Sequence, residues 1–213
     1  IDMEHSAITI DKAQELILAI KSKNIKALVR VGKNDELIIK RVMDSGADGV
    51  IVPMVNSKED AKRAVAAVKY PPFGDRGVGL ARAQNYGIDF DNYKEWLINE
   101  SVVIAQIEHK DAIENIEEII SVDGIDGAII GPYDLSASLG IPGELNSTIL
   151  NDAIAKFEKA CSSAEFPFGY HIIKPNHSEV QEKVKLGYSF IGFSIDFFFL
   201  GDKLREEMEA ING

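Results

Sequence analysis

The sequence predicts an α/β fold, a (β/α)8 TIM barrel that lacks its first βα unit in this chain, and three observations support this prediction. Short apolar runs alternate with amphipathic segments of helical period along the chain. The runs are nearly continuous, which is typical of parallel strands covered on both faces. Seven such strands, of which the first starts abruptly, favour an incomplete barrel, although an open doubly wound sheet has the same periodicity.

The expected elements follow one another in regular order. Strands are expected to begin near Asp2, Lys26, Gly49, Val102, Gly127, Pro167 and Phe190. Apolar residues at helical spacing predict helices at residues 10–23, 35–45, 57–70, 89–99, 111–122, 148–166, 178–186 and 197–211. Ser57 is the expected N-cap of the third helix, which Pro71 and Pro72 end. No linker or repeat divides the chain, so residues 1–213 are expected to form a single, N-terminally incomplete barrel domain.

Residues 71–88 form the one long irregular segment, rich in glycine and arginine. A loop of that length inside a compact domain is usually functional or mobile. Its Arg76 would either contact a distal anionic group of a substrate or only hold the loop in place.

Composition excludes several classes of partner. The net charge of −11 argues against nucleic acid, because phosphate binding needs clustered lysine and arginine. The longest apolar run, residues 190–200, contains Ser194 and Asp196 and is too short to span a membrane, so we expect no membrane partner. Cys161 is the single cysteine, which rules out an internal disulfide and suits a reducing, cytoplasmic location.

Two carboxylates mark the candidate site. Glu108 follows the apolar run at residues 102–105, and Asp134 follows the run at 128–130, with one helical segment between them. This βαβ pattern places both side chains at the same end of neighbouring parallel strands. Converging carboxylates repel unless one is protonated or a cation lies between them, and a hard divalent metal is the simplest solution. Alone, each would more often be a helix cap or a surface residue.

Other polar residues end the remaining strands. In a barrel, the C-terminal strand ends share one mouth, and here they carry Asp2, Glu4, His5, Arg30, Gln106, Glu108, Asp134, His171 and Asp196. A lone histidine would more often be structural, and His171 is as consistent with a pocket wall as with a structural role. The joint occurrence of histidine, arginine and carboxylates on separate strand ends favours a catalytic site.

At these residues the chain resembles the HpcH/HpaI family of metal-dependent class II pyruvate aldolases. The resemblance rests on motifs in family order across nearly the whole chain: Asp2-Met3-Glu4-His5, Val29-Arg30-Val31, residues 44–54 (DSGADGVIVPM), Tyr70-Pro71-Pro72 with Gly74-Asp75-Arg76-Gly77, Gln106-Ile107-Glu108 and Gly131-Pro132-Tyr133-Asp134-Leu135. Family members are longer by about one strand and helix before the first motif.

The resemblance implies a site and an activity. Glu108 and Asp134 would bind the metal, Mg²⁺, Mn²⁺ or Co²⁺, and His5 with Asp2 would form a base dyad. Arg30 would contact the 2-oxo acid, and Gln106, Tyr133 and Asp134 would also bind substrate. The implied reaction cleaves or forms 4-hydroxy-2-oxo acids through a pyruvate enolate, with a 2-oxo acid and an aldehyde as small-molecule partners. A hexamer in which the C-terminal helix, about 197–211, is exchanged between subunits is also implied.

The consecutive Phe197, Phe198, Phe199 and Leu200 independently suggest an oligomer, because helical side chains point about 100° apart and cannot all face one barrel. Two other functions stay open. A lyase of the citrate-lyase β or malyl-CoA type would need a basic site for the CoA diphosphate, and no lysine or arginine cluster provides one. A non-catalytic barrel that lacks its first unit would keep the mouth residues without the activity.

Overall fold

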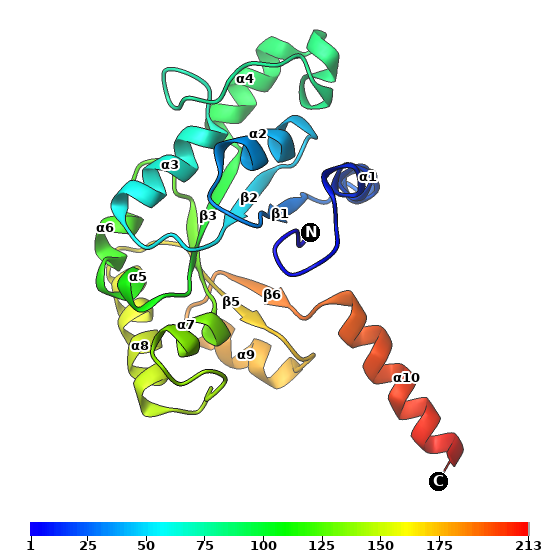
Figure 1. Cartoon of the computed structure of the whole chain (residues 1–213), viewed down its shortest axis with the longest axis vertical. Coiled ribbons are helices and arrows are strands. Elements are labelled where there is room, and N and C mark those ends of the chain that lie inside the picture. The colour runs from blue at the N-terminus through cyan, green and yellow to red at the C-terminus, as the bar shows by residue number, and fades with distance from the viewer. Residues whose placement is uncertain (213) are drawn as a thin grey trace.

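One parallel sheet forms the centre of the molecule (Figure 1). The computed structural model describes residues 1–212; residue 213, the last of the expected domain, lies outside the described residues. Six strands pair in the order of the chain: β1 (Leu28–Arg30), β2 (Gly49–Val52), β3 (Val102–Ile107), β4 (Gly127–Ile130), β5 (Phe168–Ile172) and β6 (Phe190–Phe193). Every neighbouring pair is parallel, so each strand is followed by a crossover on the outside of the sheet.

The expected TIM barrel, incomplete only by its first βα unit, is wrong. In the part of the chain that the structure describes, β1 and β6 are the two edges of the sheet, which makes it an open half-barrel. The strand expected near Asp2 is only an isolated bridge to Arg30, with Arg30 N–H donating to Ile1 O and Met3 N–H to Arg30 O, both at 2.8 Å. Strand and helix alternation is the same in open and closed parallel sheets, because closure depends on pairing between the first and last strands.

Helices between the strands cover the outside of the curved sheet, whereas the last helix extends away from it (Figure 1). They are α1 (Ile10–Lys21), α2 (Glu36–Asp44), α3 (Lys58–Val68), α4 (Phe90–Asn99), α5 (Lys110–Glu114), α6 (Ile116–Ile120), α7 (Pro132–Ser138), α8 (Thr148–Ser163), α9 (His177–Lys185) and α10 (Asp196–Asn212), with a 3-10 helix η1 (Arg82–Gly87). Ser57 caps α3 as predicted, since its hydroxyl accepts the Asp60 N–H at 3.1 Å. Within residues 1–212, no helix has both the length and the apolar character that crossing a membrane requires.

The two faces of the sheet have different surroundings. The outward positions pack under the helices and are fully buried, as alternation along a strand requires: Val29, Val50, Val52, Val103, Ala105, Ala128 and Ile130. The opposite, concave face carries Arg30 on β1 and Gln106 on β3. The polar side chains of the predicted site therefore project from the face that the helices leave uncovered.

The long loop at residues 71–88 is held by a buried arginine. Arg76 is 0% exposed, and its guanidinium donates to Asp44 Oδ1 at 2.6 Å and to the Tyr93 hydroxyl at 3.1 Å. The guanidinium carbon also lies 4.8 Å from the centre of the Tyr70 ring. Of the two roles considered for Arg76, these contacts support the structural one.

Replacing Arg76 is expected to destabilise the fold strongly. Arg76→Met leaves the Asp44 carboxylate without its buried partner, so we expect a loss of about 3–5 kcal/mol in the free energy of unfolding. Urea denaturation measures this change. Arg63→Met is the matched control, because Arg63 forms an exposed pair with Asp60 and its loss should cost less than about 1 kcal/mol. Equal effects of the two substitutions would contradict the assignment.

Candidate active site

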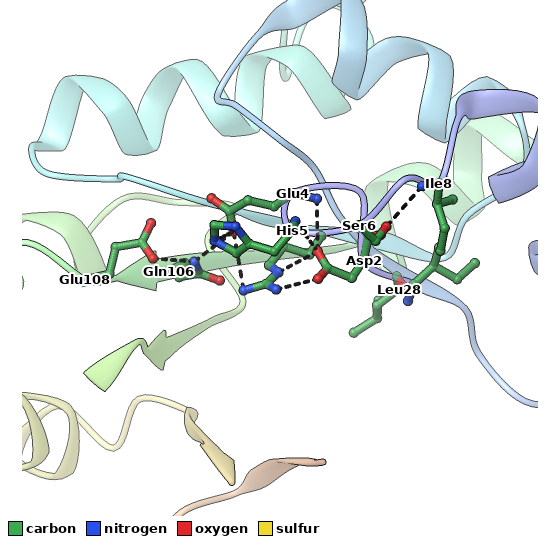
Figure 2. Close-up of polar contacts among 10 residues, drawn as sticks. Asp2, Glu4, His5, Ser6, Ile8, Leu28, Gln106 and Glu108 are labelled. Carbon is green, nitrogen blue, oxygen red and sulfur yellow. Dashed lines mark hydrogen bonds and ion pairs between the residues drawn. The ribbon is translucent and has the colours of Figure 1, made fainter. Parts of the chain in front are cut away.

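Glu108 is the best-held carboxylate of the site. It directly follows β3, is only 2% exposed, and accepts a hydrogen bond from the Gln106 side-chain amide (Figure 2). Its other oxygen, Oε1, accepts the backbone N–H of Met54 at 2.8 Å. Met54 lies just after β2 in the left-handed conformation, with φ at 52°, which is uncommon for a residue other than glycine. Donors from β3 and from the segment that follows β2 therefore fix the Glu108 side chain.

The electrostatics of this carboxylate favour a cation beside it. Burial raises the pKa of Glu108 to about 7, and the charges of Glu4 and Asp134 add to the increase. The hydrogen bonds from Gln106 and Met54 act in the opposite direction without cancelling it. A cation at this position would relieve both the desolvation and the repulsion.

Glu108 and Asp134 follow neighbouring strands of the sheet. Ile107 of β3 pairs with Ile130 of β4, so Glu108 is beside Gly131, and Asp134 follows in the first turn of α7. A Cβ added at Gly131 would lie 3.0 Å from Glu108 Cβ and 3.2 Å from its Oε2, so the absence of a side chain lets the two segments approach. Asp134 is exposed towards solvent, whereas Glu108 is buried.

The donor set fits an oxygen-bound divalent ion with an open coordination shell. No group of three or more histidine, cysteine, aspartate or glutamate side chains is arranged for a metal within residues 1–212. An ion held by Glu108 and Asp134 would therefore take its other oxygens from substrate and water, as Mg²⁺ does at many enzyme sites.

Arg30 joins the N-terminal segment to the sheet. Its Nε and Nη2 donate to the two oxygens of Asp2 at 2.9 and 2.7 Å, and Nη1 lies 3.3 Å from Glu4 Oε2. The same Glu4 oxygen accepts from the Gln106 amide at 3.2 Å. Burial alone would raise the pKa of Asp2, but the hydrogen bond from Arg30 holds it below its usual range. Asp2, Glu4, Arg30 and Gln106 thus form one charged network beside Glu108.

The structure does not bring the Asp2 carboxylate to the His5 imidazole. Asp2 Oδ1 accepts the backbone N–H groups of Glu4 at 2.9 Å and of His5 at 3.3 Å, while the imidazole is exposed and has its Nε2 3.8 Å from Glu4 Oε2. Tyr133, the remaining predicted substrate contact, is about half exposed in the first turn of α7. The roles expected for His5 and Tyr133 stay predictions.

Glu4 and Met54 contact the predicted site residues, although the sequence analysis assigned neither of them a role in the site. Glu4 links Arg30 to Gln106, and its place in Asp2-Met3-Glu4-His5, at a strand end, was a usable signal. Met54 acts through its backbone N–H, and the direction of this group depends on a left-handed φ. Methionine rarely adopts that conformation, so the sequence gives no signal for this contact.

Comparison with known proteins shows to which family the chain belongs. The family model described as HpcH/HpaI aldolase/citrate lyase matches residues 1–200. The chain belongs to this family. The hydroxypyruvate/pyruvate aldolase of Sagittula stellata is 39% identical over 92% of the chain and 76% of its own length. The 2-keto-3-deoxy-L-rhamnonate aldolase of Escherichia coli K12 is 32% identical over 98% of the chain and 78% of its own length.

Solved structures of the HpcH/HpaI family have the same fold. An HpcH/HpaI aldolase/citrate lyase family protein from Burkholderia cenocepacia gives a TM-score of 0.93 at 27% identity, over 100% of this chain and 84% of that one. The HpcH/HpaI aldolase from Desulfitobacterium hafniense gives 0.90 at 29% identity, over 99% of this chain and 81% of that one. The chain is an aldolase of the metal-dependent class II type, a carbon–carbon lyase, and neither a CoA-ester lyase nor a non-catalytic barrel is favoured.

Proposed function

We propose that this aldolase cleaves or forms 4-hydroxy-2-oxo acids through the enolate of pyruvate. The observation that carries the proposal is the buried Glu108 carboxylate, held by Gln106 and Met54 beside the charges of Glu4 and Asp134. Retro-aldol cleavage breaks the bond between C3 and C4 and leaves negative charge on the oxygen at C2. A site for this reaction must place positive charge at that oxygen.

The cation and Arg30 supply this positive charge in the proposal. Glu108 and Asp134 would hold Mg²⁺, Mn²⁺ or Co²⁺, which supplies Lewis-acid stabilisation of the C2 oxyanion when bound. Arg30 adds a permanent charge, and its pairs with Asp2 and Glu4 keep the planar guanidinium in one orientation.

The remaining residues bind substrate and move a proton. The first N–H groups of α7, near Tyr133 and Asp134, have no partner inside the helix and are suited to the pyruvate carboxylate. Gln106 presents its amide beside Glu108. In the proposal the His5 imidazole moves the C4-hydroxyl proton, and Asp2 accepts the backbone N–H of His5.

The experiment measures pyruvate release from 4-hydroxy-2-oxo acids of different chain length. We expect release that EDTA abolishes and that Mg²⁺, Mn²⁺ or Co²⁺ restores. Absence of pyruvate with every metal would contradict the proposed substrate class, and full activity in EDTA would contradict the proposed dependence on a metal.

The free, buried Cys161 thiol fits the reducing cytoplasm in which we expect the enzyme to act.

We also propose that the enzyme is a homo-oligomer, a hexamer as the resemblance to the family implies. Helix α10 extends away from the sheet in Figure 1 and leaves its apolar side chains exposed. The exposed set is Phe197, Phe199, Leu200, Leu204, Met208 and Ile211. A contiguous apolar surface of this kind marks a contact with another molecule, and exchange of α10 between subunits would cover it.

Charges on the apolar side of α10 are therefore expected to reduce the molecular mass in solution. Leu200→Asp combined with Leu204→Asp places two carboxylates on the apolar surface, which an interface cannot bury without cost. Light scattering at micromolar concentration should show a large species for the wild type and a smaller one for the double variant. Glu209→Lys, also on α10 but at a polar position, is the control. A wild type that is already monomeric would contradict the proposal.

A further inference from the structure

His171 lies on the concave face of the half-barrel. On β5, Phe168 and Tyr170 face the helices, since the Phe168 ring lies 5.9 Å from that of Phe157 on α8 and Lys183 of α9 lies 4.0 Å from the Tyr170 ring centre. Side chains alternate along a strand, so Gly169 and His171 face the other way. The imidazole therefore belongs to the face that carries Gln106 and Arg30.

Gly169 and Gly192 leave space on this face for the rings of Phe190 and His171. Gly169 pairs with Phe190, and a Cβ at Gly169 would lie 2.2 Å from the Phe190 ring, which also reaches Gly127. Gly192 pairs with His171, and a Cβ at Gly192 would lie 3.2 Å from His171 Cδ2. Phe190 thus fills the lower level of the concave face. His171 occupies the next level, towards the C-terminal ends of the strands.

The same level contains Glu108. Ile107 pairs with Ile130, and Ile130 pairs with Tyr170. Extending these registers by one residue gives a row across β3 to β6 that consists of Glu108, Gly131, His171 and Gly192. Neighbouring strands are about 4.8 Å apart, so Glu108 and His171 are separated by about 10 Å along the sheet. Gly131 is the residue between them in this row, so no side chain of β4 separates Glu108 from His171.

Charges from the opposite edge of the sheet act on His171. Burial lowers the pKa of this half-buried imidazole, and the charge of Arg30 on β1 lowers it further, while a backbone group of Ser194 and the Asp2 charge oppose the shift. The coupling to Arg30 and Asp2 means that β5 faces β1 across the concave surface. The lowered pKa favours the uncharged ring, which has one donor and one acceptor nitrogen.

We propose that His171 is a specificity-determining residue that binds a hydroxyl group on the aldehyde half of the substrate. The inference rests on the proposed function, in which Glu108, Asp134 and Arg30 bind the 2-oxo acid half. A substrate held there has its C4 and following carbons free to extend along the row towards β5. A neutral imidazole recognises a hydroxyl by donating or accepting a hydrogen bond, but it offers no permanent charge to a distal carboxylate.

The test compares two aldehydes that differ by one hydroxyl group. Addition of pyruvate to glycolaldehyde and to acetaldehyde is measured with the metal-loaded enzyme. In His171→Leu, we expect the ratio of kcat/KM for glycolaldehyde to that for acetaldehyde to fall by about 10-fold or more. His171→Gln, which keeps a donor and an acceptor, should recover much of the ratio. Tyr170→Phe, the neighbouring position on the outer face, should leave it unchanged.

Deuterium exchange at the pyruvate methyl group separates this inference from the proposed function, because exchange needs no aldehyde. Exchange in both the wild type and His171→Leu, together with a reduced aldehyde ratio, supports the assignment. An unchanged ratio overturns it, and so does an equal loss for both aldehydes in both His171 variants. A wild type without exchange and without aldol addition overturns the proposed function itself.

Discussion

Arg30→Ala is expected to lower kcat/KM for 4-hydroxy-2-oxo acids by about 10³-fold, the size of effect seen when one group that stabilises an oxyanion is removed. Arg30 is the permanent positive charge of the site, and Asp2 and Glu4 hold its guanidinium in place. Steady-state kinetics with saturating metal measure the loss. Arg30→Lys is the matched control, because it keeps the charge but not the planar fork, and it should recover only part of the activity.

The same substitution should change stability in a way that depends on pH. Arg30 lowers the pKa of Asp2 in the folded protein, so this ion pair stabilises the fold above the ordinary pKa of an aspartate and loses its effect as pH falls through the lowered value. The difference in melting temperature between wild type and Arg30→Ala should therefore be larger at pH 7 than at pH 3. Unchanged kinetics with a lower melting temperature would reassign Arg30 to a purely structural role.

The strand-end residues were predictable because a parallel sheet puts the ends of its strands on one edge. The apolar runs before Glu108 and Asp134 were recognisable, and the pairing of β3 with β4 places Glu108 beside Gly131, which directly precedes the helix that carries Asp134. Barrel closure was not predictable in this way. Closure depends on contacts between β1 and β6, which are far apart in the sequence and carry no local signal.

Two other differences also depend on contacts between residues that are far apart in the sequence. The helix expected at residues 111–122 is divided into α5 and α6 at Asn115, whose side chain donates to Asn56 O at 2.8 Å instead of facing solvent. The Asp2 carboxylate was expected beside the His5 imidazole, but in the structure Arg30 and two backbone N–H groups satisfy it. Asn56 and Arg30 are distant in sequence from Asn115 and Asp2, and periodicity and spacing do not reveal such contacts.

Glu108→Gln is expected to remove metal-dependent activity, with a loss of about 10³-fold or more, while it stabilises the metal-free protein at high pH. Glutamine keeps the shape of the side chain but cannot ionise. In the wild type the pKa of Glu108 is about 7 in the folded state, against an ordinary value of 4.5. Between these values the folded protein holds a proton that the unfolded chain releases. The free energy of unfolding of the metal-free protein therefore falls by about 3 kcal/mol as pH rises from about 4.5 to 7.

Asp134→Asn should also lose activity, but with a smaller change in the free energy of unfolding, because Asp134 is exposed.

Thermal unfolding after EDTA treatment, followed by metal addition, tests the two halves of this prediction together. Without metal, Glu108→Gln should be more stable than the wild type at pH 8 and about equally stable at pH 4, where Glu108 is mostly protonated in both the folded and the unfolded chain. A metal must displace the Glu108 proton to bind, so the affinity of the wild type should increase by up to about tenfold per pH unit below pH 7 and then level off. Added Mg²⁺ or Mn²⁺ should stabilise the wild type at pH 8 and leave Glu108→Gln unchanged. A variant that is still stabilised by metal would show that the ion binds elsewhere, and a metal affinity independent of pH would show that Glu108 is not one of its ligands.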